Sequence, residues 1–159
     1  MMKIRVSLKA SVDAVIDTAM DFERRMKWDK DIYDFRMIYK TADMSVFRLY
    51  YSYKSPPTVS DRDFYLNHLY RRNYPEPGTT VLYVHSLPDS EECPLVPRRV
   101  RANMNILGFI FKEKIDERTG KEMTDLFFVQ QVDINGSIPK WLTNNLSKNV
   151  PKAWFKKFE

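Results

Sequence analysis

The sequence predicts an α+β domain in which a curved antiparallel sheet of about seven strands surrounds one long C-terminal helix. Two patterns support this prediction. Between positions 32 and 133 most segments alternate apolar and polar residues with a period of two, and short turns separate them, which is typical of an antiparallel meander. A helical period occurs only before and after that stretch. A long, strongly twisted sheet tends to curl, and a helix lying across its concave face would enclose an internal hydrophobic cavity.

The composition is that of a single globular domain, large enough to fold without a disulfide or a metal. The chain has 159 residues, of which 43% are hydrophobic and only four are glycine. Its net charge is +5, but no run of Lys or Arg is longer than a pair, so nucleic-acid binding is not expected. The single Cys93 cannot form an internal disulfide, and there is no signal peptide or apolar run of membrane-spanning length. We therefore expect a cytoplasmic protein.

The N-terminal part of the chain predicts one strand followed by two short helices. Ile4, Val6 and Leu8 alternate with polar residues, as in a half-buried strand. Ser11 is placed to cap a helix at 12–20, and a second helix follows at 21–28. The later strands are predicted at 32–40, 47–54, 63–72, 79–86, 98–112 and 123–133.

A helical period returns at the C-terminus. Residues 135–139 form a turn and helix-entry signal, with Pro139 near the first helical position. Leu142, Leu146 and Val150 then recur on one face, and Pro151 predicts a kink. These features predict a long final helix whose apolar face covers the sheet.

No motif for catalysis or for a cofactor is present. The chain lacks a glycine-rich phosphate loop, a nucleophile elbow, an HExxH helix and a CxxC pair. The two histidines, His68 and His85, lie on different predicted strands, and a zinc site needs three or four ligands. We therefore expect no catalytic residues, no metal and no cofactor.

Five segments, in this order, resemble the START family of lipid transfer domains. They are Trp28-Asp29, residues 60–64, the loop 86–94, residues 100–102 and the segment 133–142. The last segment, extended through 151, is most similar to the phosphatidylcholine-transfer branch of that family. The resemblance implies a helix-grip fold with one lipid in an internal tunnel, the C-terminal helix as a lid, and no enzymatic activity.

Two departures from the family pattern limit what the resemblance transfers. We interpret residues 1–159 as a single START-like domain that lacks the family's N-terminal helix and first strand hairpin. The tunnel positions at which several members carry a carboxylate and an arginine fall here on Leu49 and His68. Ligand specificity that depends on that ion pair is therefore not expected.

Strand parity and the resemblance together give a candidate ligand-binding set. His68 shares an inward parity with apolar neighbours, so it is either a contact for a headgroup phosphate or sterol hydroxyl, or a core histidine bonded to a tyrosine. Arg62 is expected to bond a carboxylate or carbonyl at a strand start, and Arg101 to face outward. The set comprises His68, Leu49, Tyr51, Tyr53, Phe64, Leu66, Ala102 and Met104, with Leu142, Leu146 and Val150 on the helix.

The expected function is to bind one lipid, a phospholipid or with less support a sterol, and to transfer or sense it between membranes. We expect a monomer that is peripheral at membranes and contacts their surfaces transiently. Two alternatives remain. One is a helix-grip enzyme, such as a cyclase or hydrolase, acting on a hydrophobic substrate. The other is a non-catalytic lipid-sensing module of a larger protein.

Overall fold

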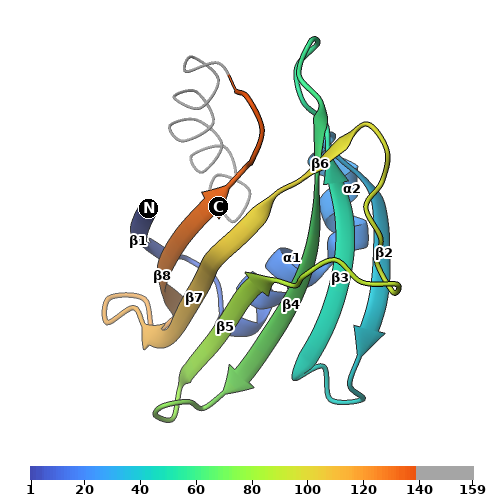
Figure 1. Ribbon diagram of the computed structural model, residues 1–159. Helices are drawn as coiled ribbons and strands as arrows, with labels where there is room; N and C mark the ends of the chain where they lie inside the picture. The colour runs from blue at the N-terminus through green and yellow to red at the C-terminus, as the bar shows by residue number, and fades with distance from the viewer. Residues whose placement is uncertain (139–159) are drawn as a thin grey trace.

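A computed structural model describes residues 1–138, so the predicted helix residues Leu142, Leu146 and Val150 lie outside the described part. In that part, eight strands form one sheet in the order β1-β8-β7-β5-β4-β3-β2, with β6 paired to β4 (Figure 1). The elements are β1 (Met2–Leu8), α1 (Val12–Met20), α2 (Phe22–Trp28), β2 (Ile32–Lys40), β3 (Val46–Tyr53), β4 (Asp61–Arg72), β5 (Thr79–Ser86), β6 (Arg99–Arg101), β7 (Asn103–Ile115) and β8 (Glu122–Asp133).

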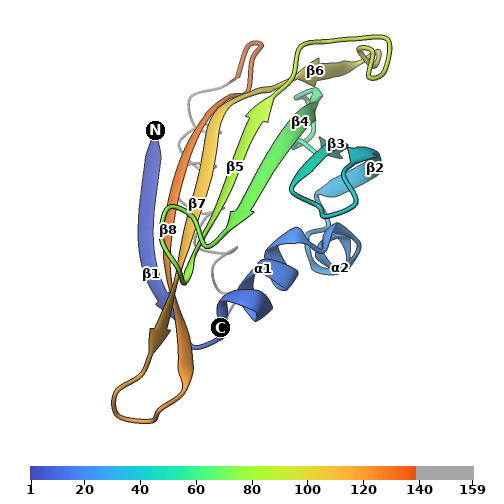
Figure 2. The same cartoon turned by 90° about the horizontal axis from the view of Figure 1, so that it is seen from below.

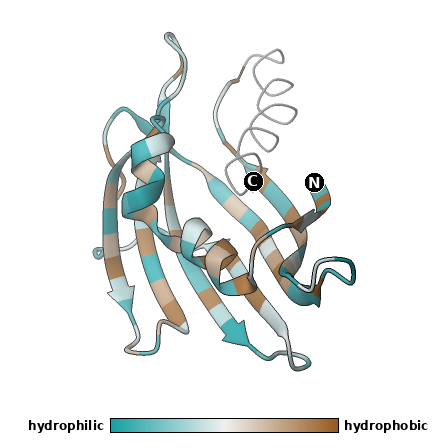
Figure 3. Ribbon diagram, turned by 180° about the vertical axis from the view of Figure 1, so that it is seen from behind, coloured by the Kyte–Doolittle hydropathy of each residue, from teal (hydrophilic) through white to brown (hydrophobic). Residues whose placement is uncertain are grey.

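The sheet is curled, and both helices lie on its concave side (Figure 2). All neighbouring strands are antiparallel except β6, which runs parallel to β4. The curved antiparallel sheet predicted from the alternating pattern is therefore confirmed. Along most strands hydrophobic and hydrophilic residues alternate, so the two faces of the sheet differ in character (Figure 3).

One predicted strand is divided in two. The sequence predicts a continuous strand over 98–112, but β6 ends at Arg101 and β7 begins at Asn103. Between them, the Ala102 amide donates a hydrogen bond of 2.9 Å to the carbonyl of Asp63 on β4. The chain changes its pairing partner at this residue, from β4 to β5 and β8, and this change raises the strand number to eight.

Both helices are capped, α1 by Ser11 as the sequence predicts and α2 by Asp21, although the sequence predicts that residue inside the helix. The Ser11 hydroxyl accepts a hydrogen bond of 3.3 Å from the Ala14 amide, and α1 buries Val12, Val15, Ile16 and Ala19. The Asp21 carboxylate accepts a bond of 2.8 Å from the Arg24 amide at the start of α2. In both caps the side chain accepts a hydrogen bond from the amide three residues later, which would otherwise be unpaired in the first turn.

The side chain of Phe22 joins α2 to the concave face. Its ring stacks on Phe35 of β2 with centroids 5.0 Å apart, and it lies 6.4 Å from the ring of Tyr51 on β3. Ring pairs at these separations add specific packing to the burial of apolar area. None of the described helices is long and apolar enough to cross a membrane.

Candidate functional site

The concave face carries the main core, and every described member of the predicted ligand-binding set belongs to it or contacts it. The most deeply buried are Leu49, Leu66 and Ala102, each at most 1% exposed. The other buried members are Tyr51, Phe64, His68 and Met104, and Tyr53 is half-buried against them. Strand register brings them together, because Tyr51 pairs with Phe64 and Leu49 with Leu66 across β3 and β4.

His68 is the polar residue at the centre of this apolar surface. Its ring stacks on Phe47 with centroids 4.4 Å apart and meets the ring of Phe22 edge-on at 6.2 Å. Burial, which leaves 4% of the residue exposed, lowers its pKa to about 3, so the imidazole is uncharged at neutral pH. Its Nδ1 atom is buried and has no hydrogen-bond partner among the described residues. The tyrosine partner that the sequence left open is therefore not observed.

An ion pair lies beside the tyrosines of this surface. The guanidinium of Arg25 is 3.4 Å from the Asp29 carboxylate, and the two side chains are 19% and 11% exposed. Both belong to α2 or its C-cap and are spaced i,i+4. Burial raises the pKa of the Tyr51 and Tyr53 hydroxyls. The positive charge of Arg25 lowers both pKa values and the negative charge of Asp29 raises them. The ion pair and the two tyrosine hydroxyls therefore give the apolar surface a polar neighbour with charges of both signs.

Arg62 bonds carbonyl groups at the start of β4, as predicted. Its Nε donates a hydrogen bond of 3.0 Å to the carbonyl of Ile134, and its Nη2 one of 2.9 Å to that of Asn135. Its Nη1 donates to the carbonyl of Ser60. Only 6% of the residue is exposed, and burial lowers its pKa.

Arg101 faces outward on the convex side, as predicted, but it is largely buried there. Its Nε donates a hydrogen bond of 2.9 Å to the Asp63 carboxylate, which is 1% exposed. The loop 87–98 folds back over this part of the sheet, and its Asp89 carboxylate and Pro94 carbonyl also bind the Arg101 guanidinium. A returning loop leaves no periodic signal in the sequence, which is why the buried pair was missed.

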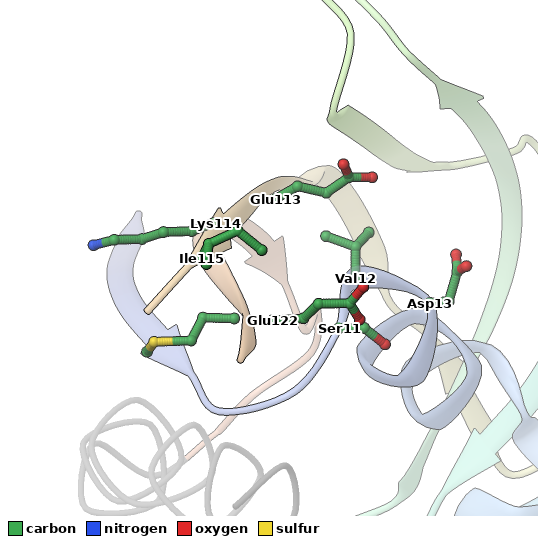
Figure 4. A pocket seen from close by; sticks show the side chains of 8 residues that line it. Ser11, Val12, Asp13, Glu113, Lys114, Ile115 and Glu122 are labelled. Atoms are coloured by element: carbon green, nitrogen blue, oxygen red, sulfur yellow. The ribbon is translucent and has the colours of Figure 1, made fainter. Parts of the chain in front are cut away.

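A hollow lies away from the predicted ligand-binding set. It has a volume of about 200 Å³ and lies between the start of α1 and the hairpin that joins β7 to β8 (Figure 4). Its lining is mostly polar, with Asp13, Glu113 and Glu122 among its residues, and it includes none of the predicted ligand-binding set. Within residues 1–138 no group of acidic, His or Cys side chains is arranged to hold a metal ion.

A curled antiparallel sheet with short helices on its concave side and an apolar inner face is the helix-grip architecture. The sequence model of the START domain family matches residues 1–159, so the chain belongs to that family. The sequence-based family prediction is thus confirmed.

Two curated relatives are START domain-containing protein 10 from mouse and from human. Each is 26% identical over 151 residues, which cover 92% of this chain and 47% of the relative. The chain therefore spans about half the length of the curated relatives it matches.

Solved structures agree on the fold. The crystal structure of human STARD10 has a TM-score of 0.78 at 22% identity, covering 98% of this chain and 60% of that one. The human StarD13 lipid transfer and protein localization domain scores 0.71 at 22% identity, over 91% of this chain and 68% of that one. Human StAR-related lipid transfer protein 5 scores 0.70 at 20% identity, over 95% and 68%.

Proposed function

We propose that this domain binds a single lipid against its concave face and carries or senses it between membranes, without catalysing a reaction. The observation that carries the proposal is an apolar surface that lies beside a half-buried ion pair, Arg25–Asp29. The relatives support it, because the StarD13 region is a lipid transfer and protein localization domain and the third structure is that of StAR-related lipid transfer protein 5.

The apolar surface suits acyl chains. Leu49, Leu66 and Met104 present aliphatic side chains from three strands, and Phe64 adds an aromatic ring. Each buried methylene of a lipid tail gains about 0.8 kcal/mol, so an enclosing surface of this kind can compete with a bilayer without covalent chemistry. The tunnel in which the tails would lie is part of this proposal.

The Arg25–Asp29 pair suits a zwitterionic phospholipid headgroup. A phosphate carries a negative charge that Arg25 can bind, and a choline or ethanolamine carries a positive charge that Asp29 and the ring of Tyr51 can receive. A pair with no net charge offers little advantage to an anionic headgroup. A sterol would instead place its single hydroxyl at the free Nδ1 of His68.

The environment of His68 supports a non-catalytic role. An acid/base pair on the concave face would be required for the alternative of a cyclase or hydrolase. His68 instead lies between the rings of Phe47 and Phe22, and its lowered pKa keeps the imidazole uncharged. We further propose that the protein acts as a monomer in the cytoplasm and contacts membranes transiently, where its charge of +5 favours encounter with anionic surfaces.

The proposal is tested by incubating the protein with vesicles of phosphatidylcholine, phosphatidylethanolamine, phosphatidylserine and cholesterol, re-isolating it and quantifying the bound lipid. We expect Arg25→Gln and Asp29→Asn each to weaken phosphatidylcholine binding about tenfold, equivalent to about 1.4 kcal/mol. Arg24→Gln, on the exposed side of the same helix, is the matched control and should bind as the parent does. Stoichiometric cholesterol with no phospholipid would overturn the headgroup assignment, and no bound lipid would overturn the proposed function.

A further inference from the structure

We propose that the convex side of the sheet binds a partner protein through an amphipathic α-helix whose apolar face is flanked by acidic side chains. The proposal concerns the side opposite the candidate lipid site and does not depend on lipid binding. In an antiparallel sheet with one face in solvent, alternate residues on that face are expected to be polar. The central strands depart from this pattern, because β5, β7 and β8 each contain a continuous apolar run, at 81–84, 106–111 and 126–129.

Strand register joins the outward side chains of these runs into one surface. Across the sheet, Tyr83, Gly108 and Val129 are neighbours in one row, and Val81, Ile110 and Phe127 are neighbours in the next. Leu69 of β4 extends the first row, since it pairs with Tyr83. We refer to this surface as the convex patch, and its apolar side chains are those of Leu69, Val81, Tyr83, Ile110, Phe127 and Val129.

The convex patch is separate from the core of the described residues. Phe127 and Leu69 are each 39% exposed, and the other four side chains are half-buried. The core instead uses the alternate residues of the same strands, which point to the concave side, where both described helices lie (Figure 2). A sheet face made of apolar side chains is ordinarily covered by a further layer of protein, and large exposed patches mark interaction sites.

Basic side chains flank the convex patch. Lys3 and Arg5 of β1 pair with patch residues on β8, and Arg71 of β4 pairs with a patch residue on β5. Lys112 and Lys114 follow the patch on the same face of β7. All five side chains belong to exposed residues. The patch therefore has a positively charged rim.

The carboxylates that the structure places at this rim are already paired. Asp125 lies 3.9 Å from the guanidinium of Arg5 and 4.0 Å from the ammonium of Lys114. Glu76 lies 2.7 Å from the ammonium of Lys112. Among the described residues, the rim cations outnumber these carboxylates. Acidic residues on a partner would complement the rim, raise the rate of encounter and fix the orientation of binding.

An acid-flanked helix fits these features better than other occupants do. A second copy of the chain would bring two basic rims together, which is unfavourable. A flat anionic bilayer would meet only part of the patch, because the sheet curls away from its convex side (Figure 2). A helix is narrow enough to lie along the strands, with its apolar stripe on the patch and its acidic flanks beside the basic rim.

The probe for this site is a designed helical peptide of about 18 residues. Leucine occupies the i, i+3, i+4 and i+7 positions, and glutamate occupies the flanking positions. The control peptide has lysine in place of every glutamate. Binding of each labelled peptide to the whole chain is measured by fluorescence anisotropy, and urea unfolding checks that each variant is folded as the parent is.

We expect the glutamate peptide to bind with micromolar affinity and the lysine peptide to bind at least about tenfold more weakly. Phe127→Ser and Leu69→Ser each remove an exposed side chain of the convex patch and should weaken binding of the glutamate peptide about tenfold. Ile115→Ser is the matched control, because Ile115 is 56% exposed and belongs to β7 but lies on its other face. It should bind the peptide as the parent does.

The contribution of charge is tested by the double variant Lys3→Glu/Arg5→Glu. It should weaken binding of the glutamate peptide and strengthen binding of the lysine peptide, because the charge of the rim is reversed along β1. Equal affinity for the two peptides, or affinity that Phe127→Ser and Leu69→Ser leave unchanged, would overturn the proposal.

Two other results would assign the convex patch to a different occupant and also overturn the proposal. One is a dimer, seen by sedimentation, that Phe127→Ser dissociates. The other is binding to phosphatidylserine vesicles that Phe127→Ser abolishes, with neither peptide bound. Lipid loading of Phe127→Ser should equal that of the parent, since the patch and the candidate lipid site lie on opposite faces. Failure of the peptide to bind and failure to load lipid are therefore observed separately.

Discussion

The imidazole of His68 lies parallel to the phenyl ring of Phe47, with centroids 4.4 Å apart and planes 16° apart. The two residues are partners across β4 and β3, so strand pairing sets their contact. An ionisable ring has thus been placed in apolar surroundings, where burial lowers its pKa to about 3. The consequence is a dependence of stability on pH that one residue controls.

We predict that the free energy of unfolding decreases as pH falls below 6.5, the ordinary pKa of histidine. The pKa of His68 is lowered in the folded chain, so between that value and about 3 the unfolded chain binds a proton that the folded chain does not. The stabilisation is complete above pH 6.5 and is lost as pH falls, with a slope of up to about 1.4 kcal/mol per pH unit. Urea unfolding at several pH values measures it.

The matched variant for this prediction is His68→Gln, which keeps a polar side chain but cannot take up a proton. Its stability should change less steeply with pH than that of the parent. Equal slopes for the two proteins between pH 6.5 and 5 would contradict the assignment to His68.

The convex face gives a second prediction, on the buried Asp63–Arg101 pair. Asp63→Asn leaves a largely buried guanidinium without its buried charge partner, and the hydroxyl of Tyr50 loses a carboxylate acceptor at 3.0 Å. Removing one partner of a buried pair costs about 3–5 kcal/mol. Asp89→Asn removes the exposed partner of the same arginine and should cost less than about 1 kcal/mol. The free energy of unfolding of both variants is measured in urea. Similar losses would contradict the prediction, because the buried Asp63 would then contribute no more than the exposed Asp89.

A third prediction compares two glycines. Gly136 and Gly120 both have positive φ, 74° and 67°, so alanine at either position costs about 1–2 kcal/mol in backbone strain. An added Cβ at Gly120 meets nothing within 4 Å, whereas at Gly136 it approaches the Arg62 guanidinium at 3.4 Å. Because 3.4 Å is ordinary van der Waals contact, backbone strain dominates at both positions, and the two alanine variants should lower Tm by similar amounts. A much larger decrease in Tm for Gly136→Ala would contradict this prediction and show that the Arg62 guanidinium resists displacement.

The sheet was predictable because its signal is local. Alternation along β1 reflects one half-buried face, and Ser11 caps α1 through a contact three residues away. The inward parity of His68 and Leu49 follows from the same period, so their burial was predicted correctly. Which of these residues touches a ligand stays a prediction.

The features that the sequence did not reveal depend on contacts between distant segments. The division of the 98–112 strand results from a hydrogen bond between Ala102 and Asp63, and the burial of Arg101 results from the loop that returns over it. The role of Arg62 requires the carbonyls of Ile134 and Asn135, more than 70 positions away. No periodicity encodes such contacts. The Arg25–Asp29 pair was visible as an i,i+4 spacing, but its place beside Tyr51 was not.

The proposed binding of one lipid per chain is measured by native mass spectrometry of the purified whole chain, before and after incubation with liposomes of mixed phospholipid and sterol. We predict an added mass equal to one lipid per chain that is released on denaturation and identified as a zwitterionic phospholipid. A mass that stays at that of the bare polypeptide after the incubation would contradict the account.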